Sequence, residues 1–187
     1  MFDIQEGCGC THEYFATDEC CLGWENDLIV LPHCIIKMLL RSDKIVGDTA
    51  WYWLNYVPHI VGYVSGVRFV CLKRDKESTI ESFKKRPIDS KPRPNENMQL
   101  VYRGYKGHAF PRYKDVTPDE SISLYYDEYY DIAENLEKHY SEWFRIFTID
   151  ALNTEEGQKE ILDFAGFENH NYCVGKKLNA SPNGGKD

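Results

Sequence analysis

Two short runs of β-branched and aromatic residues limit the fold more than any other feature of the sequence. Residues 67–72 and 144–149 each have the length of a strand, and the first run is apolar enough for a sheet that is covered on both faces. Helix-start signals follow each run, so strands alternate with helices along the chain. This order predicts an α/β fold of three layers, in which helices flank a mainly parallel sheet.

The clearest helix start lies at residues 117–120, Thr-Pro-Asp-Glu. It combines a Thr N-cap, a Pro at the first helical position and a Glu three residues after the cap. A long amphipathic helix is expected to follow. Asp75 is expected to cap a helix over residues 75–85, and Asn153 to cap the last helix, which ends at Gly166.

Four further segments complete the expected order of elements. Helices are predicted at residues 28–41 and 51–64, with Pro58 breaking or kinking the second, and a short strand at 44–49. Residues 1–27, rich in Gly, Cys and acidic side chains, have an irregular pattern.

The 187 residues, 1–187, suit a single domain that can bury a sizeable core. Proline and glycine are frequent in residues 87–117, which predicts a long loop of the kind that often carries function. Residues 179–187 contain Pro and Gly among polar side chains and are expected to form a flexible tail.

The charge balance excludes one broad class of function. The chain has 22 Lys and Arg against 30 Asp and Glu, a net charge of −8, whereas nucleic-acid binders need a basic surface. The apolar stretch at residues 28–40 is interrupted by Pro32, His33 and Lys37, so it is too short and too polar to span a bilayer. With no signal-peptide pattern, we expect a cytoplasmic protein that binds neither nucleic acid nor membrane, in an oligomeric state that the sequence leaves open.

Cysteine and histidine cluster near the amino terminus and leave one alternative open. The residues that could bind zinc are Cys8, Cys10, His12, Cys20, Cys21, His33 and Cys34. Their spacing does not match the ligand pairs of structural zinc sites, in which two to four residues separate the ligands. Reduced thiols are therefore expected and no metal is predicted, and an interaction module stabilised by zinc remains an alternative.

A candidate phosphate site lies where the strand at residues 67–72 meets the next helix. Arg74 stands at the carboxyl end of the strand, and Ser82 follows eight residues later inside the helix. Ligands of open α/β sheets bind at the carboxyl ends of strands, and a guanidinium with a hydroxyl can hold a phosphate. Alternatively, Arg74 pairs with Asp75 or Glu77 on the surface.

Residues 69–75 (Phe-Val-Cys-Leu-Lys-Arg-Asp), followed by Ser82-Phe83, resemble the 3′-phosphate-binding motif of sulfotransferases that use 3′-phosphoadenosine 5′-phosphosulfate (PAPS). Residues 46–50 are similar to the segment that precedes this strand in the family. Residues 10–13 resemble the turn at the end of the family's second strand. Weaker similarity to bacterial members extends to residues 110–113, to the tyrosine-rich helix and to residues 151–153.

The resemblance implies a sulfotransferase fold of the P-loop-like, nucleotide-binding kind. It implies transfer of a sulfuryl group from PAPS to a hydroxyl or amine acceptor, with adenosine 3′,5′-bisphosphate as the product. Arg74 and Ser82 would hold the 3′-phosphate. His12 or Glu13 would be the catalytic base, although His12 could instead bind a backbone carbonyl and Glu13 could face solvent.

The remaining candidate residues belong to the rims of such a site. In the family, a basic loop near the carboxyl terminus closes over the 3′-phosphate. Lys176 and Lys177 resemble this loop, and the alternative is that they belong to a flexible solvated tail. The long loop would help select a small-molecule or carbohydrate acceptor, and its polar side chains could equally face solvent. The cofactor candidates are Lys176 and Lys177, and the acceptor candidates are Asp48, Thr49, Arg103, His108 and Arg112.

One element of the family is missing from the sequence. The 5′-phosphosulfate loop normally follows an apolar strand and carries a Lys or Arg, but residues 7–11 are preceded by no apolar strand and contain no cation. We therefore expect either an amino-terminally truncated sulfotransferase or a remnant that binds a nucleotide or carbohydrate without catalysis.

Overall fold

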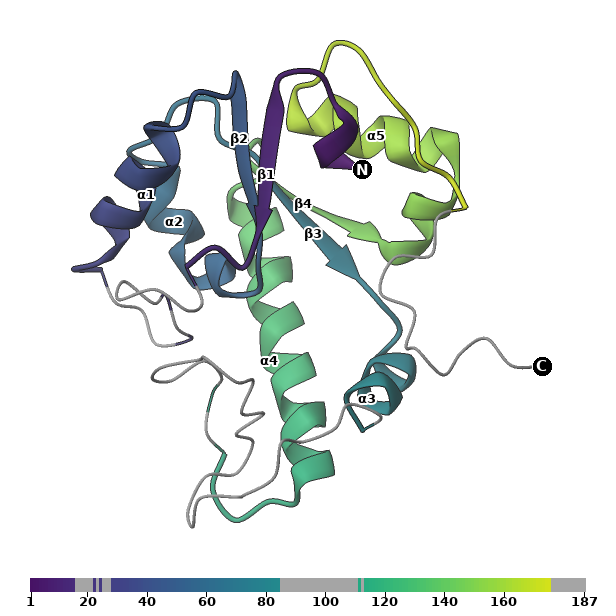
Figure 1. Ribbon diagram of the computed structural model, residues 1–187. Helices are drawn as coiled ribbons and strands as arrows, with labels where there is room; N and C mark the ends of the chain where they lie inside the picture. Colours follow the sequence, from purple (N-terminus) through teal and green to yellow (C-terminus); the bar gives the residue numbers. More distant parts are fainter. Residues whose placement is uncertain (16–21, 23, 25–27, 85–110, 112, 176–187) are drawn as a thin grey trace.

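The computed structural model describes residues 1–15, 22, 24, 28–84, 111 and 113–175 of the chain (Figure 1). The strands are β1 (Cys8–His12), β2 (Ile45–Thr49), β3 (Phe69–Lys73) and β4 (Phe144–Thr148). The α-helices are α1 (Leu31–Leu39), α2 (Val57–Ile60), α3 (Lys76–Lys84), α4 (Pro118–His139) and α5 (Glu155–Ala165). Three 3₁₀ helices complete the order: η1 (Phe2–Ile4), η2 (Tyr52–Tyr56) and η3 (Ile149–Asn153).

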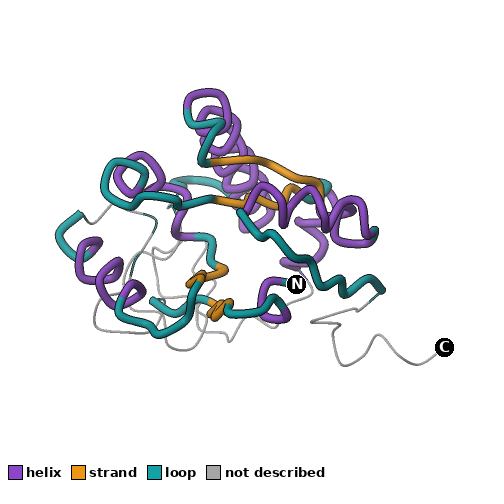
Figure 2. Tube along the Cα trace, turned by 90° about the horizontal axis from the view of Figure 1, so that it is seen from above, coloured by secondary structure: helices purple, strands orange, loops and turns teal. Residues whose placement is uncertain are grey.

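The α/β class is confirmed, but the described strands form two separate parallel pairs in place of one sheet. β1 pairs with β2, and β3 pairs with β4 (Figures 1 and 2). No residue of β1 or β2 is fully buried. Their glycines and polar side chains offer little apolar surface with which to enter a sheet between two helix layers. β3 is also less covered than its sequence predicts, since Leu72 is 37 % exposed.

Two hydrophobic clusters form the core and share one segment of the chain. The first cluster contains Phe15, Leu22, Leu31, Cys34, Tyr52, Tyr56 and Ile60. The second contains Trp24, Leu54, Val57, Cys71, Tyr125, Ala133, Leu136 and Phe144. Because η2 and α2 contribute buried side chains to both clusters, this short segment connects the β1–β2 half of the molecule to the β3–β4 half.

The segment at residues 51–64 differs from the single broken helix that its sequence predicts. It forms the 3₁₀ helix η2 and then the four-residue helix α2, with Pro58 in the first turn of α2. A proline has no N–H group to lose in a first turn, so Pro58 begins a helix here. Along this segment, Tyr52, Tyr56 and Ile60 belong to the first cluster, and Leu54 and Val57 to the second.

The sequence signals for the starts of α4 and α3 and for the end of α5 are confirmed. The Thr117 side chain accepts a hydrogen bond from the backbone N–H of Glu120, and the Glu120 carboxylate accepts one from the backbone N–H of Thr117 at 2.7 Å. Asp75 likewise accepts a 2.8 Å bond from the backbone N–H of Ser78 at the start of α3. Gly166 ends α5 with a left-handed φ of 87°.

Two predictions at the chain ends are wrong. Residues 1–27 are not irregular throughout, because residues 8–12 form β1; backbone pairing with β2 makes this strand, which has no β-branched apolar residue. The cap of α5 is Thr154, whose hydroxyl accepts a 3.0 Å bond from the backbone N–H of Gly157. Asn153 closes η3 before the extended backbone that a cap requires begins at Thr154.

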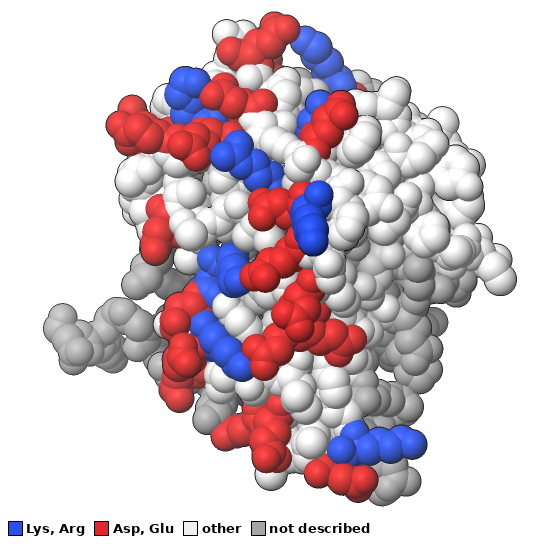
Figure 3. Space-filling view, turned by 180° about the vertical axis from the view of Figure 1, so that it is seen from behind, with Lys and Arg blue, Asp and Glu red and all other residues white. Residues whose placement is uncertain are grey.

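Helix α4 connects the core to a charged surface. Its tyrosines bind the backbone near the end of β3: Tyr130 donates to the Leu72 carbonyl at 2.9 Å and Tyr126 to the Arg74 carbonyl at 2.6 Å. Seen from behind, acidic and basic side chains gather in a column down the middle of the molecule (Figure 3). Ion pairs of α4 with Lys73 of β3 and Lys76 of α3 are Lys73–Glu134 and Lys76–Asp127, at 2.6 and 2.7 Å. Among the described residues, no helix is long and apolar enough to cross a membrane.

The cap of α4 predicts a pH dependence of stability. The hydrogen bonds from Thr117 lower the pKa of Glu120 below its ordinary value. A carboxylate with a lowered folded-state pKa stabilises the fold above its unfolded pKa, and this contribution is lost as the pH falls through the folded pKa. Glu120→Gln keeps the hydrogen-bond acceptor but cannot titrate. Between about pH 6 and about pH 3, we expect the wild type to lose more stability than Glu120→Gln in urea denaturation.

A matched control for this experiment is Glu160→Gln, which removes an exposed carboxylate of α5. Its stability should follow the wild-type pH dependence. Identical pH profiles for Glu120→Gln and the wild type would contradict the role of Glu120 in the cap.

Candidate functional site

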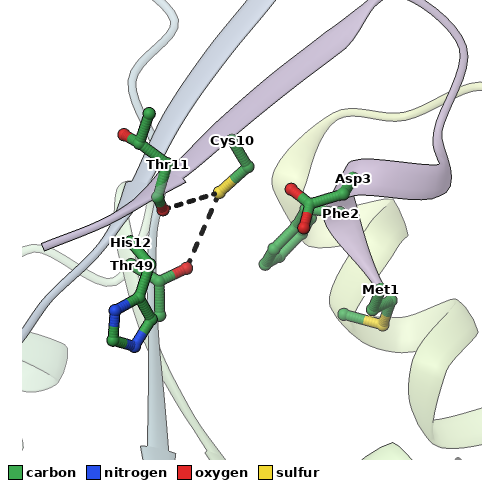
Figure 4. Close-up of a pocket in the computed structure, with 7 residues that line it drawn as sticks. All are labelled: Met1, Phe2, Asp3, Cys10, Thr11, His12 and Thr49. Carbon is green, nitrogen blue, oxygen red and sulfur yellow. Dashed lines mark hydrogen bonds between the residues drawn. The ribbon is translucent and has the colours of Figure 1, made fainter. Parts of the chain in front are cut away.

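Two of the candidate residues from the sequence meet at the carboxyl ends of β1 and β2. His12 and Thr49 are register partners at the ends of these strands. Both line a pocket of about 150 Å³ whose other side is formed by η1 (Figure 4). The full lining is Met1, Phe2, Asp3, Cys10, Thr11, His12 and Thr49. The pocket therefore lies where an α/β protein is expected to bind its ligand.

The pocket offers an imidazole, a carboxylate, hydroxyls and a thiol. The Cys10 Sγ atom is 3.6 Å from the Thr49 hydroxyl. Burial raises the pKa of the Cys10 thiol, and burial together with the Cys10 thiol raises the pKa of Cys8 to about 11. Both thiols are thus protonated at neutral pH, which argues against a nucleophilic cysteine here. None of the residues that line the pocket is Lys or Arg.

The chain leaves the pocket through a strained turn at Glu13. Glu13 has a φ of 51°, in the left-handed region that non-glycine residues seldom adopt. Its backbone N–H donates to the Thr49 carbonyl at 3.1 Å, which extends the β1–β2 pairing by one residue. The turn directs Tyr14 and Phe15 back toward Asp48 and fixes the position of His12 immediately before it.

Asp48 is fully engaged with its own chain. One carboxylate oxygen accepts hydrogen bonds from the Thr11 hydroxyl at 2.8 Å and from the Tyr14 N–H at 3.2 Å. The other accepts from the Tyr52 hydroxyl at 2.5 Å and the Trp53 indole N–H at 3.0 Å. Burial and this carboxylate raise the pKa of Tyr52 above its ordinary value. The geometry gives Asp48 a structural role, with no lone pair directed at a substrate.

Arg74 lies at the carboxyl end of β3, in the two-residue turn before α3, and is exposed. The two lysines nearest to it in the sequence form ion pairs, Lys73 with Glu134 and Lys76 with Asp127. Within the described part of the chain, no hydrogen bond or ion pair is found for the Arg74 guanidinium. The Tyr126 hydroxyl holds the Arg74 carbonyl, so the backbone of this turn is fixed while the side chain faces solvent.

Ser82 is on the same β3–α3 unit as Arg74, but no hydrogen bond joins the two residues. It is half-buried and lies six residues beyond the start of α3, a rise of about 9 Å along the helix. Figure 1 shows the carboxyl end of β3 directed toward α3 and away from the ends of β1 and β2. The phosphate candidates and the pocket are therefore at different strand ends.

Several other candidates are outside the described residues. They are Arg103, His108, Arg112, Lys176 and Lys177, together with most of the loop at 87–117 and the tail at 179–187. Two of the possible zinc ligands, Cys20 and Cys21, also lie outside the described residues. Among the described residues, no group of three His, Cys, Asp or Glu side chains could hold a metal ion, and Cys34 is buried in the first hydrophobic cluster.

The contribution of η1 to the pocket has no signal in the sequence. It depends on Gln5, a buried side chain whose amide donates to the Met1 and Asn171 carbonyls at 3.0 and 2.8 Å. The Gln5 amide oxygen also accepts from the Asn171 N–H at 2.9 Å. This clamp holds the amino-terminal residues against the segment after α5, and so places Asp3 opposite Cys10 and Thr49.

Comparison of the chain with protein-family models, with curated proteins and with solved structures finds no match. The functional assignment therefore depends on the geometry of the residues themselves.

The Asp48 network predicts a large loss of stability when it is removed. We expect Asp48→Ala to lower the free energy of unfolding by about 3 kcal/mol, because it leaves the Tyr52 and Trp53 donors without an acceptor. Urea denaturation measures this change. Asp43→Ala removes a carboxylate from the surface pair with Arg41 and should cost about 0.5 kcal/mol or less. Equal losses in the two variants would contradict the structural role of Asp48.

Proposed function

We propose that this chain binds the 3′-phosphate of PAPS or of adenosine 3′,5′-bisphosphate at Arg74 and acts as a sulfotransferase-type protein. The observation that carries the proposal is the exposed guanidinium of Arg74 at the end of a parallel strand, for which no hydrogen bond or ion pair is found among the described residues. Its charge, after the hydrogen bonds from Ser78, helps to lower the pKa of the adjacent Asp75. Lys73 and Lys76 on either side of it are neutralised by carboxylates of α4. A planar guanidinium in this position can form paired, charge-assisted hydrogen bonds with a phosphate.

Ser82 would add a hydroxyl from α3 to the same site. Nucleotide binding would then require the half-buried Ser82 side chain and the Arg74 side chain to reach one phosphate from the same β3–α3 unit. Asp75 supports this arrangement, because its bond to the Ser78 N–H fixes the first turn of α3. Both the turn and the helix start are thus held before a ligand binds.

The pocket at the ends of β1 and β2 suits the acceptor better than the phosphosulfate. Because the pocket and Arg74 are at different strand ends, transfer requires PAPS held at Arg74 to extend its phosphosulfate to the pocket. There, His12 would take the proton of an acceptor hydroxyl while the acceptor oxygen bonds to the sulfur of PAPS. The bond between that sulfur and the 5′-phosphate oxygen breaks, and adenosine 3′,5′-bisphosphate leaves with the electron pair. Asp3 would disfavour a sulfate in the pocket, but it can accept a hydrogen bond from a sugar or amine.

A second candidate function is binding of the nucleotide without transfer. It is favoured by the absence of Lys and Arg from the pocket lining. Sulfuryl transfer needs positive charge or N–H donors to stabilise the transferring group, and the residues that line the pocket around His12 include no Lys or Arg side chain. In this alternative, Arg74 still holds the 3′-phosphate, but no chemical step follows.

The 3′-phosphate role of Arg74 predicts a ligand-specific loss of affinity. We expect Arg74→Ala to weaken binding of adenosine 3′,5′-bisphosphate about 10- to 100-fold, because charge-assisted hydrogen bonds are removed. Binding of adenosine 5′-monophosphate, which has no 3′-phosphate, should be nearly unchanged. Isothermal titration calorimetry measures both affinities.

Arg145→Ala is the matched control, since it removes an arginine from the paired strand β4. It should leave both affinities near the wild-type values. Equal weakening of both ligands by Arg74→Ala, or no binding of the bisphosphate to the wild type at millimolar concentration, would contradict the proposal.

A transfer experiment separates the two candidate functions. Radiolabelled PAPS is incubated with a panel of hydroxyl and amine acceptors, and the labelled products are counted. If the chain is an enzyme, His12→Gln should lower the rate about 100-fold, because the proton acceptor is lost. The control is His139→Gln, which changes the last residue of α4 and no residue of the pocket lining. Tight binding of PAPS with no labelled product from any acceptor would favour binding without transfer.

A further inference from the structure

The hydrogen bonds between β1 and β2 leave one row of backbone groups of β1 facing away from its partner strand. The ladder begins where the Ile45 N–H donates to the Gly7 carbonyl at 2.9 Å. It ends where the Glu13 N–H donates to the Thr49 carbonyl at 3.1 Å. Successive residues of a strand direct their backbone groups to opposite edges, so residues 7, 9, 11 and 13 bind β2. The N–H and C=O groups of Cys10 point to the outer edge.

This outer edge of β1 is largely without backbone partners. The Cys8 N–H donates to the Gln5 carbonyl at 3.2 Å. Within the part of the chain that the structure describes, no hydrogen bond is found for the N–H or C=O of Cys10 or for the N–H of His12. An exposed strand edge of this kind can pair with another extended chain.

The other strand pair differs, because side chains of α4 bind both of its outer edges. Its ladder runs through the odd-numbered residues of β3 and β4, so the backbone groups of Leu72 and Ile146 face outward. The Tyr130 hydroxyl donates to the Leu72 carbonyl, and the Glu137 carboxylate accepts from the Ile146 N–H at 2.7 Å. Helix α4 thus blocks these edges, as proteins usually do, whereas the edge of β1 stays open.

The open edge lies beside the pocket. Cys10 and His12, whose backbone groups face outward, also line the pocket with their side chains, whereas the outward residues of β2, Val46 and Asp48, do not. An added strand would lie about 4.8 Å from β1, with alternate side chains on the pocket face. The pocket volume of about 150 Å³ is below the roughly 300–1,000 Å³ of sites for whole small molecules, and suits one side chain.

The charge in the pocket favours a basic side chain. The exposed Asp3 carboxylate lies across the pocket from Cys10 and Thr49 (Figure 4). Burial is the main cause of the raised pKa of the Cys10 thiol, and the Asp3 charge adds to it. With a carboxylate, a hydroxyl and no Lys or Arg in its lining, the pocket offers hydrogen-bond acceptors for an ammonium group.

The same charge argues against a second copy of the chain as the partner. Two β1 edges paired around a twofold axis would bring two Asp3 carboxylates into one interface, and like charges that face each other are destabilising. The nearby cations do not line the pocket. Arg41 is paired with Asp43 at 3.2 Å, and Lys44 lies against Gly7, before β1 begins.

We propose that the outer edge of β1 binds an extended basic peptide by strand addition, with a lysine side chain of the peptide in the pocket. The peptide backbone pairs with the Cys10 N–H and C=O groups and with the His12 N–H, which supplies affinity, and the pocket supplies specificity. The lysine ammonium donates to the Asp3 carboxylate. Peptide binding does not depend on the nucleotide site at Arg74; only a role of this peptide as the sulfuryl acceptor rests on the proposed function.

Peptide pools test the proposal with the full chain. Each pool has randomised flanks around one fixed central residue, which is lysine, alanine or glutamate, and fluorescence anisotropy measures binding. We expect the lysine pool to bind about tenfold or more tightly than the glutamate pool. In a lysine peptide selected from the pool, N-methylation of every second backbone amide should abolish binding. Methylation of the intervening amides should have little effect, because strand pairing has a period of two residues.

Two pairs of variants locate the site. Cys10→Pro removes an outward N–H but no ladder bond, and should weaken binding of the lysine peptide about tenfold or more. Val46→Pro, the same change at the outer edge of β2, is its control and should bind normally. Asp3→Asn should weaken the lysine peptide about five- to tenfold and leave the alanine peptide unchanged. Its control is Glu168→Gln, which changes an exposed carboxylate after α5. Circular dichroism verifies that the variants are folded.

Several results would overturn the proposal. It is wrong if no pool binds at about millimolar concentration, if the effect of N-methylation does not alternate, or if Asp3→Asn binds the lysine peptide as well as the wild type. It is also wrong if light scattering shows a wild-type dimer that Cys10→Pro converts to a monomer, because a second copy then covers the edge. The peptide titrations contain no nucleotide, so their failure is distinct from a failure of nucleotide binding at Arg74.

Discussion

The Asp48 carboxylate is the interaction on which the amino-terminal half of the molecule depends. It receives hydrogen bonds from β1, from the turn after β1 and from η2, and so connects residues 11–14 to residues 48–53, which lie more than 30 residues further along the chain. The Tyr52 hydroxyl extends the network by accepting a 3.0 Å bond from the Phe15 N–H. Since β1 and β2 contain no fully buried residue, polar contacts of this kind replace the apolar packing that normally holds a parallel pair.

The two halves of the molecule share no strand pairing among the described residues, so other contacts must hold them together. Residues of η2 and α2 contribute to both hydrophobic clusters. On the opposite side, the Gln5 amide connects the amino-terminal turn to Asn171, across 166 residues of chain. A buried amide with both its donor and acceptor satisfied is costly to separate. The two halves are therefore joined by an apolar contact, through η2 and α2, and by a polar one, between Gln5 and Asn171. The pocket at His12 and Thr49 includes residues of η1, which the polar contact holds in place.

The sequence predicts the features that depend on neighbouring residues and misses those that depend on distant ones. The cap at Thr117 and the left-handed Gly166 were predictable because their signals lie within a few residues of each other. β1 was missed because its pairing with β2, and not its own side chains, makes it a strand.

The candidate site follows the same rule. His12 and Thr49 lie together because β1 pairs with β2, which the sequence does not predict, and the approach of Asp3 depends on the distant Asn171. Asp48 precedes Thr49 in the sequence but does not line the pocket, and its four hydrogen bonds come from residues whose positions only the fold determines. The separation of the strands into two pairs is likewise a long-range property, which local patterns do not encode.

The position of Met1 has a practical consequence for work on this protein. Met1 lines the pocket, and its carbonyl is held by the Gln5 side chain. Residues joined ahead of Met1, such as a purification tag, would therefore leave the protein beside His12 and Thr49, where they could fill the pocket or release the clamp.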